Sequence, residues 1–169
     1  RTIKQLIGPD VALMAVLKAD GYGHGAVKVA RTALNNGASY CGVASLNEAA
    51  ILRAANIDEP ILILGYTPAW HAREALLRDV TVTLYDLDVA RAFSRAAIDL
   101  RRTARVHIKI DTGMGRLGVL PQDAPAFIGA VAALPGIEIE GMFTHFSCAD
   151  TDPDFTQLQL ARFADVLIE

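Results

Sequence analysis

Short apolar runs alternate with segments of helical spacing along the whole chain. Strand-like runs are predicted at 11–17, 40–44, 60–65, 80–85, 105–110 and 137–146. Apolar residues at helical spacing fall between and after them, at 24–37, 45–53, 68–78, 86–101, 123–134 and from 153 onward. This order of one strand followed by one helix, repeated six times, predicts an α/β fold built from parallel strands and crossover helices.

Polar side chains mark where two of these helices begin. Ser45 stands directly before a helical segment and Glu48 follows three residues later, which is the spacing of a capping box. In that motif the serine accepts a hydrogen bond from the glutamate N–H, and the glutamate side chain turns back to the N–H of the serine. Asp86 is placed to cap the helix predicted up to Arg101.

Two architectures fit this alternation, a doubly wound open sheet and a (β/α) barrel. The open sheet should carry G-x-G-x-x-G after its first strand, but GYGHG lacks the third glycine. Lys18, the 111–116 segment and His145 all follow strands, where barrel active sites are built. We therefore predict an α/β fold of the (β/α)8 TIM-barrel type.

The length of the chain suits only part of such a barrel. A complete barrel typically needs about 250 residues and eight strand-helix units, whereas this chain has 169 residues and six predicted units. RTIKQL at the start and 155–169 at the end each read as helices cut short. We expect residues 1–169 to form about six of the eight units of a barrel, as a piece of a longer protein.

Composition excludes several classes of protein. Sixteen basic and nineteen acidic residues give a net charge of -3, without the basic excess of a nucleic-acid-binding protein. No apolar run reaches the roughly 18 residues of a membrane-spanning helix, and no signal-peptide pattern begins the chain. Cys41 and Cys148 form no CxxC pair and no disulfide framework. We expect a cytoplasmic protein whose partners are small molecules.

The first candidate for chemistry is Lys18, directly after the first strand. A partly desolvated lysine at a barrel mouth can act as a nucleophile or base, although a lysine reaching out to water from a strand end is the more common case. Tyr22 lies four residues further on, among glycines, in a loop that opens into a helix. Its hydroxyl could reach an anion near that helix start, where backbone N–H groups also point.

A second group of candidates follows the fifth and sixth strands. In 105–110, valine and isoleucine alternate with His107 and Lys109, so a buried Lys109 must pair with a carboxylate such as Asp111, titrate or be modified. Arg116 stands in a glycine-rich loop, where a guanidinium can hold a carboxylate or phosphate or remain solvated. His145 can serve as an acid, base or hydrogen-bond donor, or be structural. No metal-ligand spacing and no G-x-S-x-G elbow is found.

Taken together, three motifs closely resemble the alanine racemase family. They are AVLKADGYGHG (15–25), KIDTGMGRLG (109–118) and GMFTHF (141–146), in the order and spacing of that family. The resemblance runs over essentially the whole chain. It implies a pyridoxal-phosphate enzyme with an N-terminal barrel.

The resemblance also implies a role for each matching residue. Lys18 matches the lysine that holds pyridoxal phosphate as a Schiff base and works as a base on one face of the substrate α-carbon. Tyr22 matches the tyrosine that bonds the cofactor phosphate, and His145 the histidine beside the cofactor ring. Arg116 matches the arginine near the phenolic oxygen and the substrate carboxylate. Lys109 matches a lysine that is carbamylated in many members and orients that arginine.

The activity so implied is interconversion of L- and D-alanine for peptidoglycan in a bacterial cytoplasm. In the family the second base is a tyrosine of a C-terminal β domain acting across a homodimer, so we expect this segment alone to be inactive. A serine or broad-specificity racemase of the same family is the nearest alternative. A non-catalytic pyridoxal-phosphate-binding barrel protein, or a doubly wound nucleotide-binding module, are the others.

Overall fold

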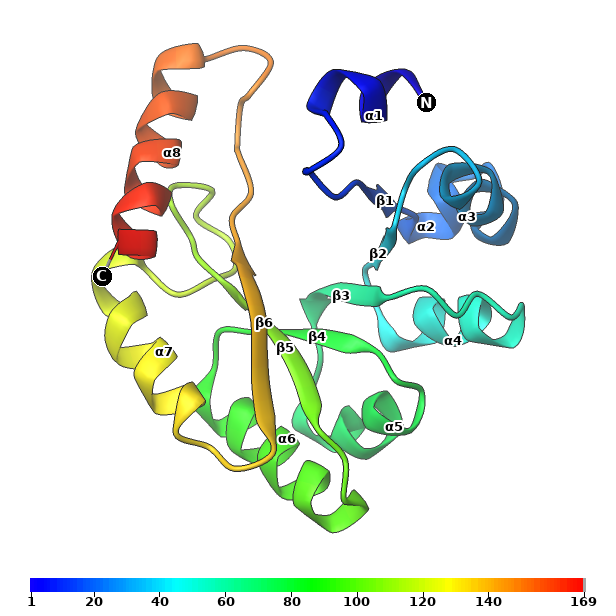
Figure 1. The fold of residues 1–169 in the computed structure, drawn as a ribbon. Coiled ribbons are helices and arrows are strands. Elements are labelled where there is room, and N and C mark those ends of the chain that lie inside the picture. The colour runs from blue at the N-terminus through cyan, green and yellow to red at the C-terminus, as the bar shows by residue number, and fades with distance from the viewer. Residues whose placement is uncertain (169) are drawn as a thin grey trace. The chain divides into compact units, whose positions relative to one another are not determined.

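The computed structural model describes residues 1–168, which divide into two compact units. The first unit is Arg1–Val82, and the second begins at Thr83. Strand β4 (Thr81–Leu84) contains the boundary between them. Figure 1 follows the chain through its strands and helices.

The first unit is built on three parallel strands. β1 (Met14–Val16) pairs with β2 (Tyr40–Val43), and β2 pairs with β3 (Ile61–Tyr66), so the strands follow chain order as in a barrel wall. The helices of this unit are α1 (Thr2–Ile7), α2 (Lys18–Tyr22), α3 (Ala26–Leu34), α4 (Leu46–Ala54), a 3-10 turn η1 (Ala69–His71) and α5 (Ala72–Leu77). This parallel pairing confirms the predicted βαβ crossovers.

The second unit repeats the same arrangement. β5 (Ala104–Lys109) pairs in parallel with β6 (Ile137–Phe143), with a register irregularity between Val106 and His107. The two strands lie side by side in Figure 1. The helices of this unit are α6 (Leu87–Leu100), η2 (Pro121–Asp123), α7 (Ala124–Ala132) and α8 (Pro153–Ile168).

Several elements are shorter than the sequence predicts. The strand expected at 11–17 spans only Met14–Val16, and the one expected at 137–146 ends at Phe143. The helix expected at 24–37 spans Ala26–Leu34, because Gly25 before it and Gly37 after it have positive φ angles of 87° and 103° that a helix cannot continue through. The predicted cap of α6 is confirmed, since Asp86 accepts hydrogen bonds from the N–H groups of residues 88 and 89.

Buried strand residues form the core of each unit. In β3 the consecutive residues Ile61, Leu62 and Ile63 are each at most 1% exposed, so both faces of this strand are covered, as in parallel sheets. In β5 burial alternates, with Val106 and Ile108 fully buried. The strand ends that carry the candidate residues therefore emerge from rigid, packed segments.

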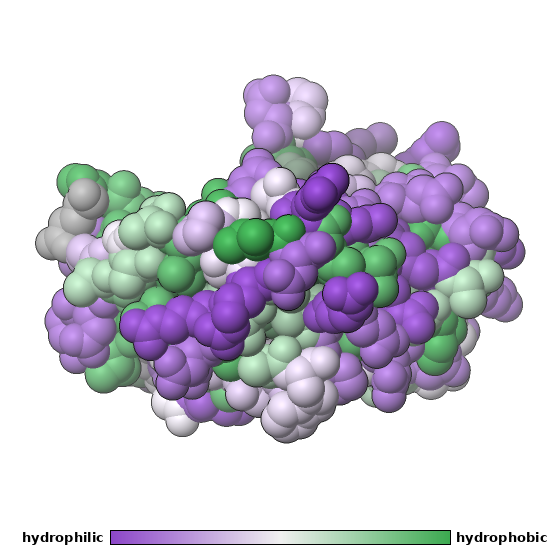
Figure 2. Space-filling view, turned by 90° about the horizontal axis from the view of Figure 1, so that it is seen from below, coloured by the Kyte–Doolittle hydropathy of each residue, from purple (hydrophilic) through white to green (hydrophobic). Residues whose placement is uncertain are grey.

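The outer surface mixes hydrophilic and hydrophobic residues. On the face drawn in Figure 2, hydrophobic positions are interspersed with hydrophilic ones. Among residues 1–168, no helix combines the length and the apolar character needed to span a membrane.

Candidate active site

Lys18 lies immediately beyond the carboxyl end of β1. The residue before it, Leu17, is completely buried, and the Leu17 N–H donates to the Gly42 carbonyl of β2 at 2.7 Å. Lys18 itself is partly exposed, and its Nζ lies 5.8 Å from the centre of the Tyr22 ring. Tyr22 is 61% exposed. The first unit thus brings Lys18 and Tyr22 together, with a partly exposed Lys18 directly after a buried residue.

The residues between them form a left-handed turn rather than an ordinary loop. Ala19 and Asp20 have φ angles of 52° and 53°, Gly21 has 64° and Tyr22 has 56°. Backbone bonds from Gly21 N–H to the Leu17 carbonyl (2.8 Å) and from Gly23 N–H to the Ala19 carbonyl (3.0 Å) close the turn. A left-handed conformation costs a non-glycine residue about 1 kcal/mol or more. Side-chain contacts must therefore stabilise this turn.

Asp20 is one of those side chains. Its Oδ1 accepts a hydrogen bond from Ala26 N–H at 2.7 Å, at the first residue of α3. The sequence analysis suggested that an anion could bind at this helix start near Tyr22. The carboxylate of Asp20 already lies there, favoured by the positive end of the helix dipole.

Glu48 is the second side chain that holds the turn. Only the serine half of the predicted capping box is confirmed. Ser45 Oγ accepts from Glu48 N–H at 3.4 Å, as predicted. The Glu48 side chain, however, does not turn back to Ser45. Its Oε2 accepts from Ala44 N–H at 2.7 Å and its Oε1 from Ala19 N–H at 2.8 Å. Glu48 therefore reaches from α4 into the turn that carries Lys18, a connection that residue spacing alone does not reveal.

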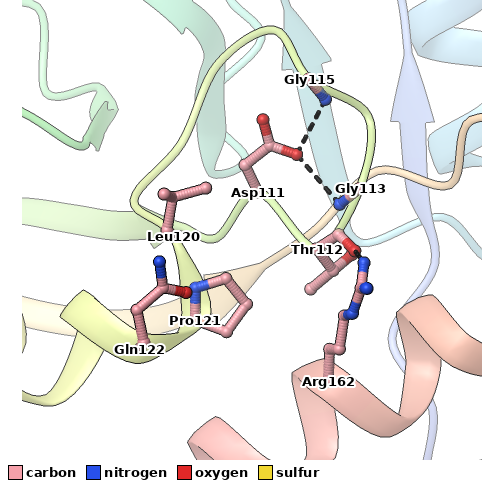
Figure 3. Close-up of a pocket in the computed structure, with 8 residues that line it drawn as sticks. All are labelled: Asp111, Thr112, Gly113, Gly115, Leu120, Pro121, Gln122 and Arg162. Carbon is pink, nitrogen blue, oxygen red and sulfur yellow. Dashed lines mark hydrogen bonds between the residues drawn. The ribbon is translucent and has the colours of Figure 1, made fainter.

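The second unit holds its glycine-rich loop with a local carboxylate. Asp111 Oδ1 accepts from the N–H groups of Gly113 and Gly115, and Oδ2 accepts from that of Arg116, each at 3.0 Å. Figure 3 shows the bonds to both glycines. At the base of the loop, Asp111 N–H donates to the Val119 carbonyl at 2.8 Å. The loop is thus closed on itself, with Arg116 exposed.

These contacts change the acidity of Asp111. Burial by itself raises the pKa of this carboxyl, but the N–H groups of the loop outweigh burial. The net result is a pKa below the ordinary aspartate value of 3.8. Asp111 is therefore ionised at neutral pH, and its charge holds the loop.

Lys109 and His107 lie on β5 just before this loop. Lys109 is only 6% exposed, and its Nζ lies 5.3 Å from the centre of the Phe143 ring of β6. His107 Nε2 lies 3.8 Å from a carboxylate oxygen of Glu140. Burial lowers the pKa of His107, and the Glu140 charge offsets only part of that effect. His107 is therefore neutral at neutral pH.

His145 follows β6, and its neighbourhood includes a residue that the sequence analysis missed. The side chain of Gln159 on α8 is completely buried, and its Nε2 donates to the His145 carbonyl and to Thr112 Oγ1, both at 3.2 Å. Its Oε1 accepts from Ser147 N–H at 3.0 Å. Gln159 thus ties the loop after β5 to the segment after β6. A lone glutamine in an amphipathic helix carries no sequence signal for this role.

A cavity of about 500 Å³ lies beside the same loop. Asp111, Gly113, Leu120 and Arg162 are among the residues that line it (Figure 3). Arg162 of α8 donates from Nη1 to the Thr112 carbonyl at 2.8 Å, so its guanidinium is already engaged with the loop. Arg116 is not part of this lining.

The Cys41 thiol of β2 is not available as a nucleophile at neutral pH. Burial, helped by the nearby charge of Glu59 and opposed by that of Arg53, raises the pKa of the Cys41 thiol to about 11. It is therefore protonated at neutral pH. Within residues 1–168, no group of three or more His, Cys, Asp or Glu side chains is arranged to hold a metal ion.

Comparison with known proteins identifies the family of the chain. The family model for the N-terminal domain of alanine racemase matches residues 1–169. The chain belongs to the alanine racemase family.

Relatives and solved structures support the same assignment. The chain is 49% identical to alanine racemase of Desulfovibrio desulfuricans over 96% of this chain and 44% of that protein. It superposes on alanine racemase of Clostridium difficile 630 in complex with cycloserine with a TM-score of 0.93 and 38% identity, over 98% of this chain and 46% of the other. A histidine racemase from Leuconostoc mesenteroides matches with a TM-score of 0.87 and 31% identity, over 94% and 43% of the two chains.

Two conclusions follow from these matches. The predicted α/β barrel fold is confirmed, with six strands among the described residues, and the doubly wound alternative is wrong. The chain spans less than half the length of the curated relatives it matches.

Proposed function

We propose that this chain is part of a racemase that interconverts L- and D-alanine with pyridoxal phosphate attached to Lys18. The observation that carries the proposal is the position of Lys18 at the end of β1, in a chain 49% identical to an alanine racemase over nearly its whole length. The active sites of barrel enzymes lie at the carboxyl ends of the strands. Lys18 meets that condition.

The residues of the first unit suit this cofactor. Covalent attachment needs an accessible amine on a fixed backbone, and Lys18 combines a partly exposed side chain with a buried residue directly before it. The Tyr22 ring lies near that amine and is largely exposed, so its hydroxyl is available to a phosphate group. We assign Lys18 to attachment of the cofactor and Tyr22 to its phosphate.

Lys18, Arg116 and His145 are then assigned separate roles in the reaction. When bound, the cofactor delocalises the negative charge that develops at the substrate α-carbon. Once the substrate amine has displaced it from the cofactor, the Lys18 amine would remove or return the proton on one face of that carbon. Arg116, exposed on a loop held by Asp111, binds the substrate carboxylate through its guanidinium. His145, exposed after β6, contacts the cofactor ring.

Lys109 is assigned a modification rather than a catalytic step. Its side chain is 6% exposed, and burying a cation is costly. Reaction of its neutral amine with carbon dioxide forms a carbamate and releases a proton, which replaces the cation with an anion able to orient Arg116. Carbon-13 NMR of the protein in labelled bicarbonate tests this: a carbamate resonance that is lost in Lys109→Ala supports it, and the absence of any such resonance overturns it.

The rest of the activity belongs to the whole protein. Inversion needs a second base on the opposite face of the α-carbon, and we assign it to a C-terminal domain acting across a homodimer. We further propose that the enzyme works in the cytoplasm and supplies D-alanine for peptidoglycan. The N-terminal barrel alone is then inactive, because one base cannot act on both faces.

A second substrate class has a specific observation in its favour. The match to a histidine racemase means that this barrel fold also serves an amino acid larger than alanine. A serine racemase or a broad-specificity racemase of the same family is also compatible with this fold. Comparing kcat/KM of the complete protein for L-alanine, L-serine and L-histidine separates the cases, and we expect alanine to be preferred.

Trapping with borohydride tests the attachment site directly. The complete protein is mixed with pyridoxal phosphate, reduced and digested, and the modified lysine is located by mass spectrometry. We expect the label on Lys18, an imine absorbance band and formation of D-alanine. Lys18→Ala should lose all three, whereas Lys28→Ala, at an exposed lysine of α3, should keep them. Label elsewhere, or turnover by Lys18→Ala, would refute the proposal, and label without any turnover would favour a binding protein.

A further inference from the structure

We propose that Glu48 is a positioning residue that sets the direction of Lys18, an inference that rests on the proposed role of Lys18 as the attachment site. The Glu48 carboxylate bridges the N–H groups of Ala19 and Ala44 at 2.8 and 2.7 Å. One of these residues follows Lys18, and the other follows the last residue of β2. Glu48 thereby fixes the backbone at the lysine to the neighbouring strand.

The bridge lies where the hydrogen bonding of the sheet stops. The bond from Leu17 N–H to the Gly42 carbonyl, at 2.7 Å, continues the pairing of β1 with β2 for one residue beyond β1. Beyond it the backbone turns left-handed at Ala19, and ordinary strand pairing ends. The Glu48 carboxylate takes over as the connection between the two chain segments at this point.

The turn needs such a connection because it is strained. Ala19 and Asp20 hold φ angles of 52° and 53°, which for non-glycine residues persist only when the surroundings enforce them. Asp20 has its own contact, to Ala26 N–H. For Ala19 the side-chain contact to its backbone comes from Glu48. The Ala19 N–H belongs to the peptide group that follows Lys18, so its bond to Glu48 holds the backbone of the lysine. Loss of the bridge would let the Lys18 amine sample other directions.

A carboxylate is the group that suits this position. Each of its two oxygens accepts one N–H, and charge-assisted bonds of this kind are stronger than neutral ones. In Glu48→Gln one oxygen becomes an NH₂ group, which faces an N–H donor and cannot accept from it. Glu48→Gln therefore removes one arm of the bridge while keeping the shape of the side chain.

The test uses the complete protein and two matched controls. Glu59→Gln removes a charge at an exposed position, and Ser45→Ala removes the other half of the α4 cap without touching the bridge. The rate of reductive labelling of Lys18 is measured at a fixed, subsaturating pyridoxal phosphate concentration. We expect Glu48→Gln to slow labelling by about tenfold, the effect of one lost charge-assisted bond, and both controls to stay close to wild type.

Hydrogen exchange in the cofactor-free protein gives a readout independent of labelling and turnover. Exchange at the Ala19 and Ala44 amides should be faster in Glu48→Gln and unchanged in Glu59→Gln. If Glu48→Gln does not fold, Glu48→Asp, which keeps the charge on a shorter arm, should label Lys18 at an intermediate rate.

Three results discriminate between the proposals. Equal labelling of Lys18 in wild type and Glu48→Gln would overturn the role of Glu48 and leave the proposed function standing. Slowing of the same size in Ser45→Ala would also overturn it, because helix stability would then be the cause. Absence of label at Lys18 in the wild type would instead overturn the proposed function.

Discussion

The turn after β1 and the loop after β5 both hold a cationic residue beyond the end of a strand, but different contacts fix the two backbones. Each follows a strand, each carries a cationic side chain for proposed ligand contacts, and in each a carboxylate accepts hydrogen bonds from backbone N–H groups. In the 111–118 loop the carboxylate is Asp111, within five residues of its partners. In the turn it is Glu48, 29 residues from Ala19. The first arrangement is closed locally, whereas the second depends on the packing of another helix.

The two segments also differ in how they place positive φ angles. In the loop these fall on glycines, including Gly113, Gly115 and Gly118, which adopt them at little steric cost. In the turn they fall largely on residues with a Cβ, including Ala19 and Tyr22. The backbone of the loop is therefore unstrained because glycines occupy its positive-φ positions. The turn instead holds strained residues beside Lys18, the lysine proposed to carry the cofactor.

The largest effect expected in the loop comes from Gly118→Ala. A Cβ at this position would lie 2.6 Å from the Asp111 nitrogen and 2.9 Å from the Ile110 carbonyl carbon, at a φ of 134°. Backbone must therefore move, and we expect a loss of about 3 kcal/mol or more in the free energy of unfolding. Urea unfolding measures it. Gly129→Ala in α7, where a Cβ meets nothing within 4 Å, is the control and should stabilise.

Removing the buried amide of α8 should have the next largest effect. Gln159→Leu removes the hydrogen bonds that Gln159 makes to the His145 carbonyl, Thr112 Oγ1 and Ser147 N–H. We expect it to cost about 2 kcal/mol, while Gln157→Leu at an exposed position of the same helix stays near wild type. Equal melting temperatures for the two variants would mean that the Gln159 hydrogen bonds contribute nothing measurable to the stability of this region.

Much of the fold and part of the site could be predicted from these residues. Strand and helix order follows from apolar periodicity, and Asp86 as a cap follows from its place directly before a helical segment. Lys18, Arg116 and His145 could be singled out as candidates because they follow strands. The second contact of Glu48 and the role of Gln159 were not, because each depends on which distant segments pack together rather than on local spacing. The left-handed turn was missed because no residue type between Lys18 and Tyr22 except Gly21 favours it.

The charge of Asp111 makes the loop sensitive to acid. Its pKa is lowered in the folded protein, so its contribution to stability is complete above the ordinary value of 3.8 and is lost as pH falls through the folded value. Asp111→Ala should therefore lower the free energy of unfolding by about 1 kcal/mol at neutral pH, given solvent screening. The deficit relative to wild type should shrink below pH 3.8. Urea titrations across this range check it, and a deficit independent of pH would assign the effect to packing.

The smallest effect is expected in the turn, where it separates strain from flexibility. Ala19→Gly relieves a left-handed residue of about 1 kcal/mol, but glycine loses about as much through its greater freedom in the unfolded chain. The free energy of unfolding should therefore stay within about 0.5 kcal/mol of wild type. Because Glu48 binds the backbone N–H of residue 19, which glycine also has, the bridge should survive and Lys18 should be labelled at the wild-type rate. A marked gain in stability would mean that the strain at Ala19 is larger than its contacts offset, and a marked loss of labelling would mean that the alanine itself, rather than Glu48, keeps the lysine in place.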